Sequence, residues 1–212
     1  GQTEGMTMSF LSQEDHQRAL AGDHEERLAS CGREGFVTDI KLADPQGNTV
    51  PRDGQTPGEI LVRSEANMIG YWRRPELTAD TLRDGWMWTG DIAVWDSEGY
   101  IFIVDRAKDM IISGGVNIYP QEAENILLGH AAVLDAAVFG VPNDEFGEEV
   151  KAVIELAPGY IADAALATEL IAYCRDHIAD IKGPRSVDFE PALPRLPNGK
   201  LYKRELKARY WP

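Results

Sequence analysis

The sequence is poor in the residues that build disulfide frameworks and histidine-ligated metal sites. Its 212 residues include two cysteines, Cys31 and Cys174, and four histidines. Neither set shows the close spacing of a metal site. Two distant cysteines also argue against a disulfide framework. Reduced thiols fit a cytoplasmic protein best, and we expect that location.

Long apolar runs are lacking as well. No run approaches the ~18–20 residues that a membrane-spanning helix needs, and no segment has the character of a signal peptide. We therefore expect no transmembrane segment.

Positive charge is scarce over most of the chain. There are 21 Lys and Arg residues against 35 Asp and Glu, which gives a formal net charge of -14. Such a charge repels nucleic-acid phosphates, so we expect no nucleic-acid partner. A polyanionic ligand would need a local basic cluster, and a solvated basic tail is the alternative interpretation of that cluster. The candidate cations are Arg195, Lys200, Lys203, Arg204, Lys207 and Arg209.

What remains is an ordinary globular composition, with 43% hydrophobic and 26% charged residues. The first half predicts a β-rich unit, a small barrel or a distorted sheet, because short apolar stretches alternate with Gly- and Pro-containing turns. A short helix is expected at 76–82, where Pro75 suits a first turn. The expected strands are 36–42, 59–63, 86–88, 93–95 and 100–104.

The pattern changes after Asp105. A hairpin is expected over 110–119, and Pro120 opens a helical pattern with acids in its first turns. The predicted fold class is α+β: a β-rich distorted barrel over 1–106, a hinge, and a small α+β domain over 107–212. In that domain we expect helices at 120–128, 164–178 and 203–210 and strands at 133–141, 149–156 and 186–190.

Two short motifs in the middle of the chain could contact a nucleotide. In Trp88-Thr89-Gly90-Asp91, a carboxylate after Gly could accept two hydrogen bonds from the vicinal diol of a ribose. A common turn is the alternative. Arg106 offers five donors to a polar ligand, although a salt-bridged linker would use the same residue.

Three further motifs are weak when taken singly. Ser113-Gly114-Gly115 has one Gly more than a turn needs, which would leave a narrow passage for a thin ligand. Lys200 follows Gly199 in a loop and is either an exposed turn lysine or a mobile cation for a carboxylate and a phosphate. Thr3 and Glu4 pair a hydroxyl with a hard oxygen ligand for Mg²⁺.

Together, in this order and spacing, the motifs resemble those of the superfamily of adenylate-forming enzymes, which includes acyl-CoA and aryl-CoA synthetases, peptide-synthetase adenylation domains and beetle luciferases. The resemblance covers essentially the whole chain. The matching segments are Gly1-Gln2-Thr3-Glu4, Gly70-Tyr71-Trp72 with Pro75-Glu76 and Thr78, Asp84-Gly85-Trp86 leading into Thr89-Gly90-Asp91, Asp105-Arg106 through Tyr119-Pro120, and Pro197-Asn198-Gly199-Lys200.

The resemblance implies a role for each matching residue. Thr3 would contact ATP phosphates and Glu4 would ligate Mg²⁺. Asp91 and Arg106 would bind the ribose. The implied catalytic residues are Lys200 and Arg106, with Lys200 bridging the carboxylate and the α-phosphate. Lys108 would be the hinge, and Gly115 would line the pantetheine channel of CoA.

The implied reaction is ATP-dependent activation of a carboxylic acid to an acyl-adenylate and transfer to CoA, with release of AMP and pyrophosphate. ATP, Mg²⁺ and CoA are the expected cofactors and co-substrates, and a fatty acid is the first expectation for the acid. The hinge sequence favours a CoA ligase over amino-acid adenylating domains and luciferases. An adenylation domain that loads a carrier protein and a non-catalytic binding module remain alternatives.

The family's glycine-rich phosphate loop and its large N-terminal region are absent from these residues. We therefore expect the 212-residue chain to be inactive alone. We also expect it to work with the N-terminal portion of the same enzyme.

Overall fold

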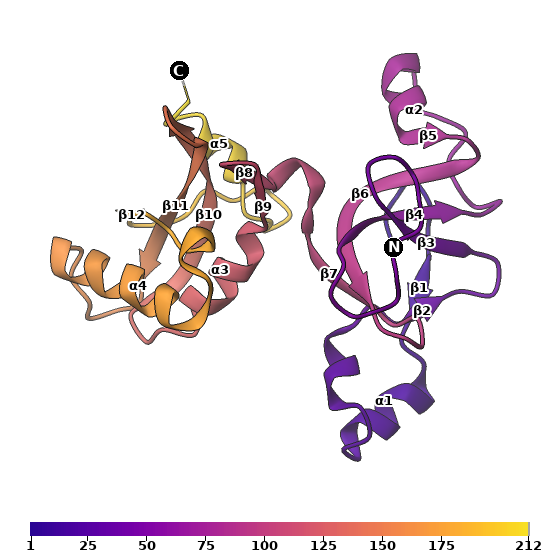
Figure 1. Ribbon diagram of the computed structural model, residues 1–212, viewed down its shortest axis with the longest axis horizontal. Coiled ribbons are helices and arrows are strands. Elements are labelled where there is room, and N and C mark those ends of the chain that lie inside the picture. The colour runs from indigo at the N-terminus through magenta and orange to yellow at the C-terminus, as the bar shows by residue number, and fades with distance from the viewer. Residues whose placement is uncertain (212) are drawn as a thin grey trace. The chain divides into compact units, whose positions relative to one another are not determined.

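The computed structural model describes residues 1–211 and divides the chain into two compact units, Gly1–Ala107 and the residues from Lys108 onward. A short 3₁₀ turn, η2 (Ala107–Asp109), runs across the division. Both units combine sheets with helices (Figure 1). The α+β prediction is therefore confirmed.

The first unit is organised around a five-stranded sheet of order β3-β4-β6-β5, with β7 pairing to another stretch of β6. No pairing among the described residues joins the two edges, so the sheet is open rather than a closed barrel. The elements of the first unit are β1 (Ser9–Phe10), α1 (Gln13–Leu20), η1 (Glu25–Ala29), β2 (Arg33–Glu34), β3 (Asp39–Ala43), β4 (Gly58–Arg63), α2 (Pro75–Thr81), β5 (Leu82–Arg83), β6 (Trp86–Trp95) and β7 (Ile101–Arg106).

Three expectations for this unit need correction. Helix α1 was not predicted, although Ser12 and Asp15 form a capping box at its start. The stretches 86–88 and 93–95 belong to one strand, β6. Phe36 and Val37 precede β3 instead of opening it and are 100% and 77% exposed, because the chain turns between Gly35 and Thr38.

The second unit also holds a five-stranded sheet, of order β10-β11-β8-β9, with β12 pairing parallel to β11. Helices α3 and α4 pack with this sheet (Figure 1). The elements are β8 (Ile111–Ser113), β9 (Val116–Ile118), α3 (Pro120–Leu128), β10 (Val133–Asn143), β11 (Gly147–Leu156), α4 (Ala164–His177), η3 (Asp180–Lys182), β12 (Ser186–Glu190) and α5 (Lys203–Lys207). The last helix is shorter than the expected 203–210.

Strand β10 is apolar on both faces because both faces are covered. Ala136 and Val138 point into a cluster with Leu127 of α3 and Leu170 of α4. The alternate residue Phe139 points into a second cluster, which includes Leu206 of α5 and Leu193. The two-residue period of a strand thus divides one apolar run between two cores. This packing ties the segment around Lys200 to the sheet.

Candidate functional site

Asp91 and Arg106 form an ion pair across two neighbouring strands. They are register partners on β6 and β7, and Arg106 Nε lies 2.7 Å from Asp91 Oδ1. The Asp91 side chain is 21% exposed and that of Arg106 47% exposed. A half-buried carboxylate beside a guanidinium offers acceptors and donors to one polyhydroxyl ligand.

An irregularity in the pairing of β6 with β4 takes Asp91 out of the ladder between these two strands. Glu59 of β4 faces Ile92 and Leu61 faces Trp88, so Ile60 alone spans Thr89, Gly90 and Asp91. Gly90 makes this possible with a φ of 74°, in the left-handed region that glycine adopts without strain. Bulges of this kind re-aim side chains next to active sites.

Side-chain hydrogen bonds hold the bulge in place. Thr89 Oγ1 donates to Ile60 O at 2.9 Å and accepts from Asp91 N at 3.1 Å. Glu59 Oε1 accepts from Gly90 N at 2.9 Å. Burial raises the pKa of the Glu59 carboxyl, which the Gly90 N–H partly counteracts. The conformation of the Thr-Gly-Asp motif is therefore set from the neighbouring strand.

A second bulge lies directly opposite, in β7. Ile92 faces Asp105 but Ala93 faces Ile103, which leaves Val104 as the extra residue. Arg106 N donates to Asp105 Oδ1 at 2.7 Å, just before the chain enters the second unit. Irregular pairing thus occurs at Asp91 on β6 and two residues before Arg106 on β7.

The Thr3–Glu4 segment belongs to the same unit as Asp91 and Arg106. Thr3 is exposed, and Glu4 is half-buried with its Oε1 accepting from the Tyr71 hydroxyl at 3.0 Å. Burial, and then the Glu4 hydrogen bond, raises the pKa of Tyr71, which therefore stays a donor. Tyr71 lies in the Gly70-Tyr71-Trp72 segment, which was identified from the sequence. Its contact with Glu4 was not predicted.

Glu4 was predicted as a magnesium ligand. The described residues contain no group of three or more Asp, Glu, His or Cys that could hold a metal ion. Magnesium is commonly bound through one or two carboxylates together with substrate phosphates rather than by an all-protein cage. A single carboxylate with one oxygen already oriented fits that mode.

The other three predicted residues belong to the second unit. Lys108 is an exposed residue of η2, at the division between the units. Gly114 and Gly115 are the two central residues of the β8–β9 hairpin, with φ of 56° and 81°. A two-residue turn with both φ values positive requires such residues. The hairpin accommodates both glycines, and the passage for CoA along Gly115 stays a prediction.

Lys200 directly follows the tip of a tight hairpin loop. Leu196 N donates to Lys200 O and Gly199 N donates to Leu196 O, both at 2.8 Å. Pro197 suits the first turn position, and Gly199 has a φ of 84°. This is a type I turn followed by a left-handed glycine, a common three-residue hairpin. It presents Lys200 as an exposed cation.

The C-terminal cations are mostly paired within the second unit. Within residues 1–211, Lys200 and Arg204 make no ion pair, whereas the other four members of the predicted cluster do. The pairs are Arg195–Asp135, Lys203–Glu124 at 2.6 Å, Lys207–Glu148 at 3.3 Å and Arg209–Glu190 at 2.7 Å. Internal pairing therefore leaves Lys200 at a hairpin tip as a cation available to a ligand.

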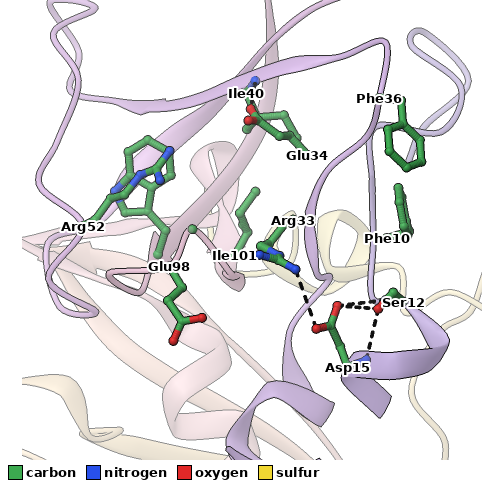
Figure 2. Close-up of a pocket in the computed structure, with 12 residues that line it drawn as sticks. Phe10, Ser12, Asp15, Arg33, Glu34, Phe36, Ile40, Arg52, Glu98 and Ile101 are labelled. Atoms are coloured by element: carbon green, nitrogen blue, oxygen red, sulfur yellow. Dashed lines mark hydrogen bonds and ion pairs between the residues drawn. The ribbon is translucent and has the colours of Figure 1, made fainter. Parts of the chain in front are cut away.

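A separate cavity of about 400 Å³ opens in the first unit. Figure 2 shows Arg33 directed at Asp15, with Phe10 and Phe36 on one side and Arg52 on the other. None of the residues predicted from the motifs lines it. The cavity is therefore not part of the candidate site.

No helix among the described residues is long and apolar enough to cross a membrane.

Comparison with protein families gives two matches. The model described as "AMP-binding enzyme" matches residues 1–72, and "AMP-binding enzyme C-terminal domain" matches residues 122–200. The two matches fall on opposite sides of the division at Ala107 and Lys108.

Curated relatives share substantial identity with the chain. A feruloyl-CoA synthase of an Amycolatopsis species is 47% identical over 185 residues, which are 87% of this chain and 37% of that protein. The medium/long-chain-fatty-acid–CoA ligase FadD8 of Mycobacterium tuberculosis is 37% identical over 216 aligned residues, spanning 100% of this chain and 36% of that protein. The chain thus spans about a third of the length of these relatives.

Solved structures show the same fold. The amide bond synthetase McbA of Marinactinospora thermotolerans superimposes with a TM-score of 0.84 at 36% identity, covering 100% of this chain and 41% of that one. The o-succinylbenzoate CoA synthetase MenE of Bacillus subtilis gives 0.82 at 33% identity, covering 98% and 40%. By motifs, fold and relatives, the chain belongs to the adenylate-forming family of AMP-binding enzymes.

Proposed function

We propose that the protein activates a carboxylic acid with ATP and transfers the acyl group to CoA, releasing AMP and pyrophosphate. The observation that carries the proposal is the Asp91–Arg106 pair, which lies at irregular stretches of the last two strands before the division between the units. The family match and the names of the relatives, which include CoA ligases and synthetases, support it.

In this proposal Asp91 and Arg106 bind the ribose of the nucleotide. A carboxylate accepts from both hydroxyls of a vicinal diol, while the guanidinium donates to hydroxyl or phosphate oxygens. The ion pair of 2.7 Å orients both groups before the ligand arrives. Pre-ordered donors and acceptors lower the entropy lost on binding.

Lys200 acts in adenylation. A carboxylate oxygen attacks the α-phosphorus of ATP and pyrophosphate leaves, so two anions must approach each other. An exposed ammonium that makes no ion pair within residues 1–211 reduces that repulsion and stabilises the developing charge. Thr3 contributes a hydroxyl donor to the phosphates, and Glu4 holds Mg²⁺. When bound, the metal supplies charge neutralisation at the phosphates.

The second half-reaction forms the thioester. The CoA thiol attacks the acyl carbonyl carbon and AMP leaves. Lys200 is then no longer needed, and a thiol path lined by Gly115 must open. Rotation about Lys108 between the two half-reactions would serve both needs, as domain movements do in many enzymes. The position of Lys108 at the division between two compact units supports this assignment.

The acid is proposed to be a fatty acid, and ferulic acid or a related aryl acid is the alternative that the relatives' names suggest. The protein, in the form that its natural host makes, should be incubated with ATP, Mg²⁺, CoA and each acid. The products are then identified by mass spectrometry. The expected product is the acyl-CoA thioester with equimolar AMP.

The acyl acceptor is tested in the same assay. Replacing CoA by an acyl carrier protein distinguishes a carrier-loading domain, and replacing it by an amine tests the amide bond synthesis that the name of one structural relative states. Transfer to either acceptor in preference to CoA would overturn the CoA assignment. A protein that consumes no ATP with any acid would instead be the non-catalytic binding module.

The 212-residue chain assayed by itself is expected to show negligible CoA ligation and pyrophosphate release. It carries the Asp91, Arg106 and Lys200 motifs but no glycine- and hydroxyl-rich phosphate loop. Robust turnover by this polypeptide with any acid would contradict the expectation.

A further inference from the structure

The Thr3–Glu4 turn is hydrogen-bonded to a segment that lies more than sixty residues later in the chain. Met68 N donates to Glu4 O at 2.6 Å, and the Tyr71 hydroxyl donates to Glu4 Oε1 at 3.0 Å. The sequence separation of Glu4 and Tyr71 is 67 residues. Both the backbone and the carboxylate of Glu4 are therefore positioned by one loop.

The backbone of Tyr71 is itself anchored. Its backbone N–H donates to Thr78 Oγ1 at 2.9 Å, and the Thr78 hydroxyl donates to Arg74 O at 2.9 Å. Thr78 lies on α2, so a helix fixes the loop that presents the phenol. The backbone position from which the phenol reaches Glu4 is thus fixed by the fold.

Gly5, the residue that follows Glu4, is closely packed. Gly5 is buried, and a Cβ at this position would lie 2.5 Å from Met8 Cε and 2.7 Å from Met87 Cε. Met6 has a φ of 55°, and Arg73, which follows Tyr71 closely in the chain, has a φ of 56°. Left-handed non-glycine residues persist only where the surroundings over-determine them, and they cluster at functional sites.

The Glu4 carboxylate is left with one oxygen available. Oε1 is taken by Tyr71, whereas Oε2 has no hydrogen bond or ion pair with any described residue. The side chain is half-buried, so this oxygen has restricted exposure. Such an arrangement is typical of a carboxylate that ligates a metal through one oxygen while a neighbouring donor orients it.

We infer that Tyr71 is a positioning residue for Glu4, acting through its hydroxyl to turn Oε2 toward the magnesium ion that accompanies ATP. The inference rests on the proposed function, in which Glu4 holds that ion. Tyr71 does not touch the reacting atoms. It sets the rotamer of a carboxylate that does not have to reorganise when the metal–nucleotide complex binds.

The test measures how strongly Mg²⁺ enhances ATP binding, by titration calorimetry with and without Mg²⁺, in the protein as its natural host makes it. Tyr71→Phe removes only the hydroxyl. Orienting partners of metal ligands are typically worth about 10–100-fold in metal affinity, so the enhancement should fall about tenfold. Affinity for ATP without Mg²⁺ should be unchanged. In steady state, the KM for Mg²⁺ should rise more than kcat falls.

The matched control is Tyr100→Phe. Tyr100 also donates its hydroxyl to a carboxylate, that of Asp15 at 2.6 Å, but neither residue belongs to the proposed nucleotide site. This variant should lose stability without changing the Mg²⁺ enhancement. If Tyr71→Phe folds poorly, Thr78→Val tests the same idea through the anchor. It should lower the enhancement, and Thr78→Ser should restore it.

Glu4→Gln separates the inference from the function on which it rests. If Glu4→Gln leaves the Mg²⁺ enhancement intact, the magnesium role of Glu4 fails and the inference fails with it. If Glu4→Gln abolishes the enhancement but Tyr71→Phe does not alter it, only the inference is overturned. A loss of ATP affinity in Tyr71→Phe that is equal with and without Mg²⁺ would also overturn it, because that is the signature of a structural defect.

Discussion

At the scale of single residues, the candidate ribose site depends on a cross-strand ion pair whose members are only partly exposed. Asp91 and Arg106 lie 2.7 Å apart on irregular stretches of β6 and β7. Exposed pairs of this kind add little to stability. On the proposed function, substitution of either residue should therefore affect nucleotide affinity more than folding.

Asp91→Asn should weaken ATP binding by about 1.5–3 kcal/mol, the range for hydrogen bonds to charged groups. This is roughly tenfold or more in Kd. Calorimetric titration with ATP measures it. The matched control is Asp39→Asn, which breaks an exposed cross-strand pair with Arg63 at 2.8 Å on β3 and β4. Equal losses of affinity in both variants would contradict the ribose assignment.

A second residue-scale prediction concerns acid stability. The Tyr100 hydroxyl, more than Ser12, lowers the pKa of Asp15 from 3.8 to about 2. Because the pKa of Asp15 is lower in the folded protein than in the unfolded chain, its ionised carboxylate stabilises the fold at pH values above the unfolded pKa of 3.8. This stabilisation is lost as the pH falls toward 2. Allowing for solvent screening, the contribution is about 1–2 kcal/mol at neutral pH.

Urea unfolding between pH 7 and pH 2.5 checks this contribution. Asp15→Asn should be less stable than the parent at pH 7, and the difference should shrink as pH falls below about 4. In a Tyr100→Phe background the difference should be smaller at every pH, because the hydroxyl donor is gone. A difference that stays constant with pH would refute the assignment.

At the scale of elements, the hairpin that carries Lys200 is the feature with the clearest demand on sequence. Gly199 holds a φ of 84°, and no atom lies within 4 Å of a Cβ built there. A side chain would therefore meet no clash, but the left-handed backbone would cost roughly 1–2 kcal/mol. The strain would be relieved by movement of the loop, which displaces Lys200.

Gly199→Ala should therefore slow adenylation several-fold while leaving thioester formation from a supplied acyl-adenylate unchanged. Single-turnover assays of each half-reaction measure the two effects. Gly159→Ala is the matched control, since Gly159 also has a positive φ, 95°, and no neighbour within 4 Å of a Cβ built there. If that control slows adenylation as much, the loop assignment is wrong.

The elements also show what the sequence could and could not predict. Most strands and helices of the second unit were predicted near their observed bounds, because strong apolar periodicity and Pro120 mark them. The capping box of Ser12 and Asp15 was a readable signal for α1 that went unused. The bulges that set Asp91 were not readable, because strand register depends on tertiary pairing.

Site residues divide in the same way. Short motifs identified Asp91, Arg106 and Lys200 as candidates, since each lies in a local pattern with a definite residue type and spacing. The partners Tyr71 and Glu59 were not predicted. They act on Glu4 and Gly90 across 67 and 31 residues, and no local pattern in a single sequence encodes such contacts.

At the scale of the whole molecule, we propose that the two units rotate about Lys108 between half-reactions. Proline fixes φ near -65° and lacks an N–H, so Lys108→Pro should restrict that rotation. We expect at least one half-reaction to fall more than tenfold while the other is retained. Lys108→Ala, which removes the charge but not the backbone freedom, should keep both. Equal behaviour of the two variants would contradict a backbone pivot.

In the proposed reaction, Lys200 assists the attack of a carboxylate on ATP. Carboxylic-acid-dependent exchange of labelled pyrophosphate into ATP measures this step by itself, on the protein in the form that its natural host makes and without CoA. We expect exchange with an apolar carboxylic acid, and Lys200→Met should reduce it at least a hundredfold, about 2.7 kcal/mol. Exchange that survives Lys200→Met, or no exchange with any acid of a broad panel, would rule out this role of Lys200.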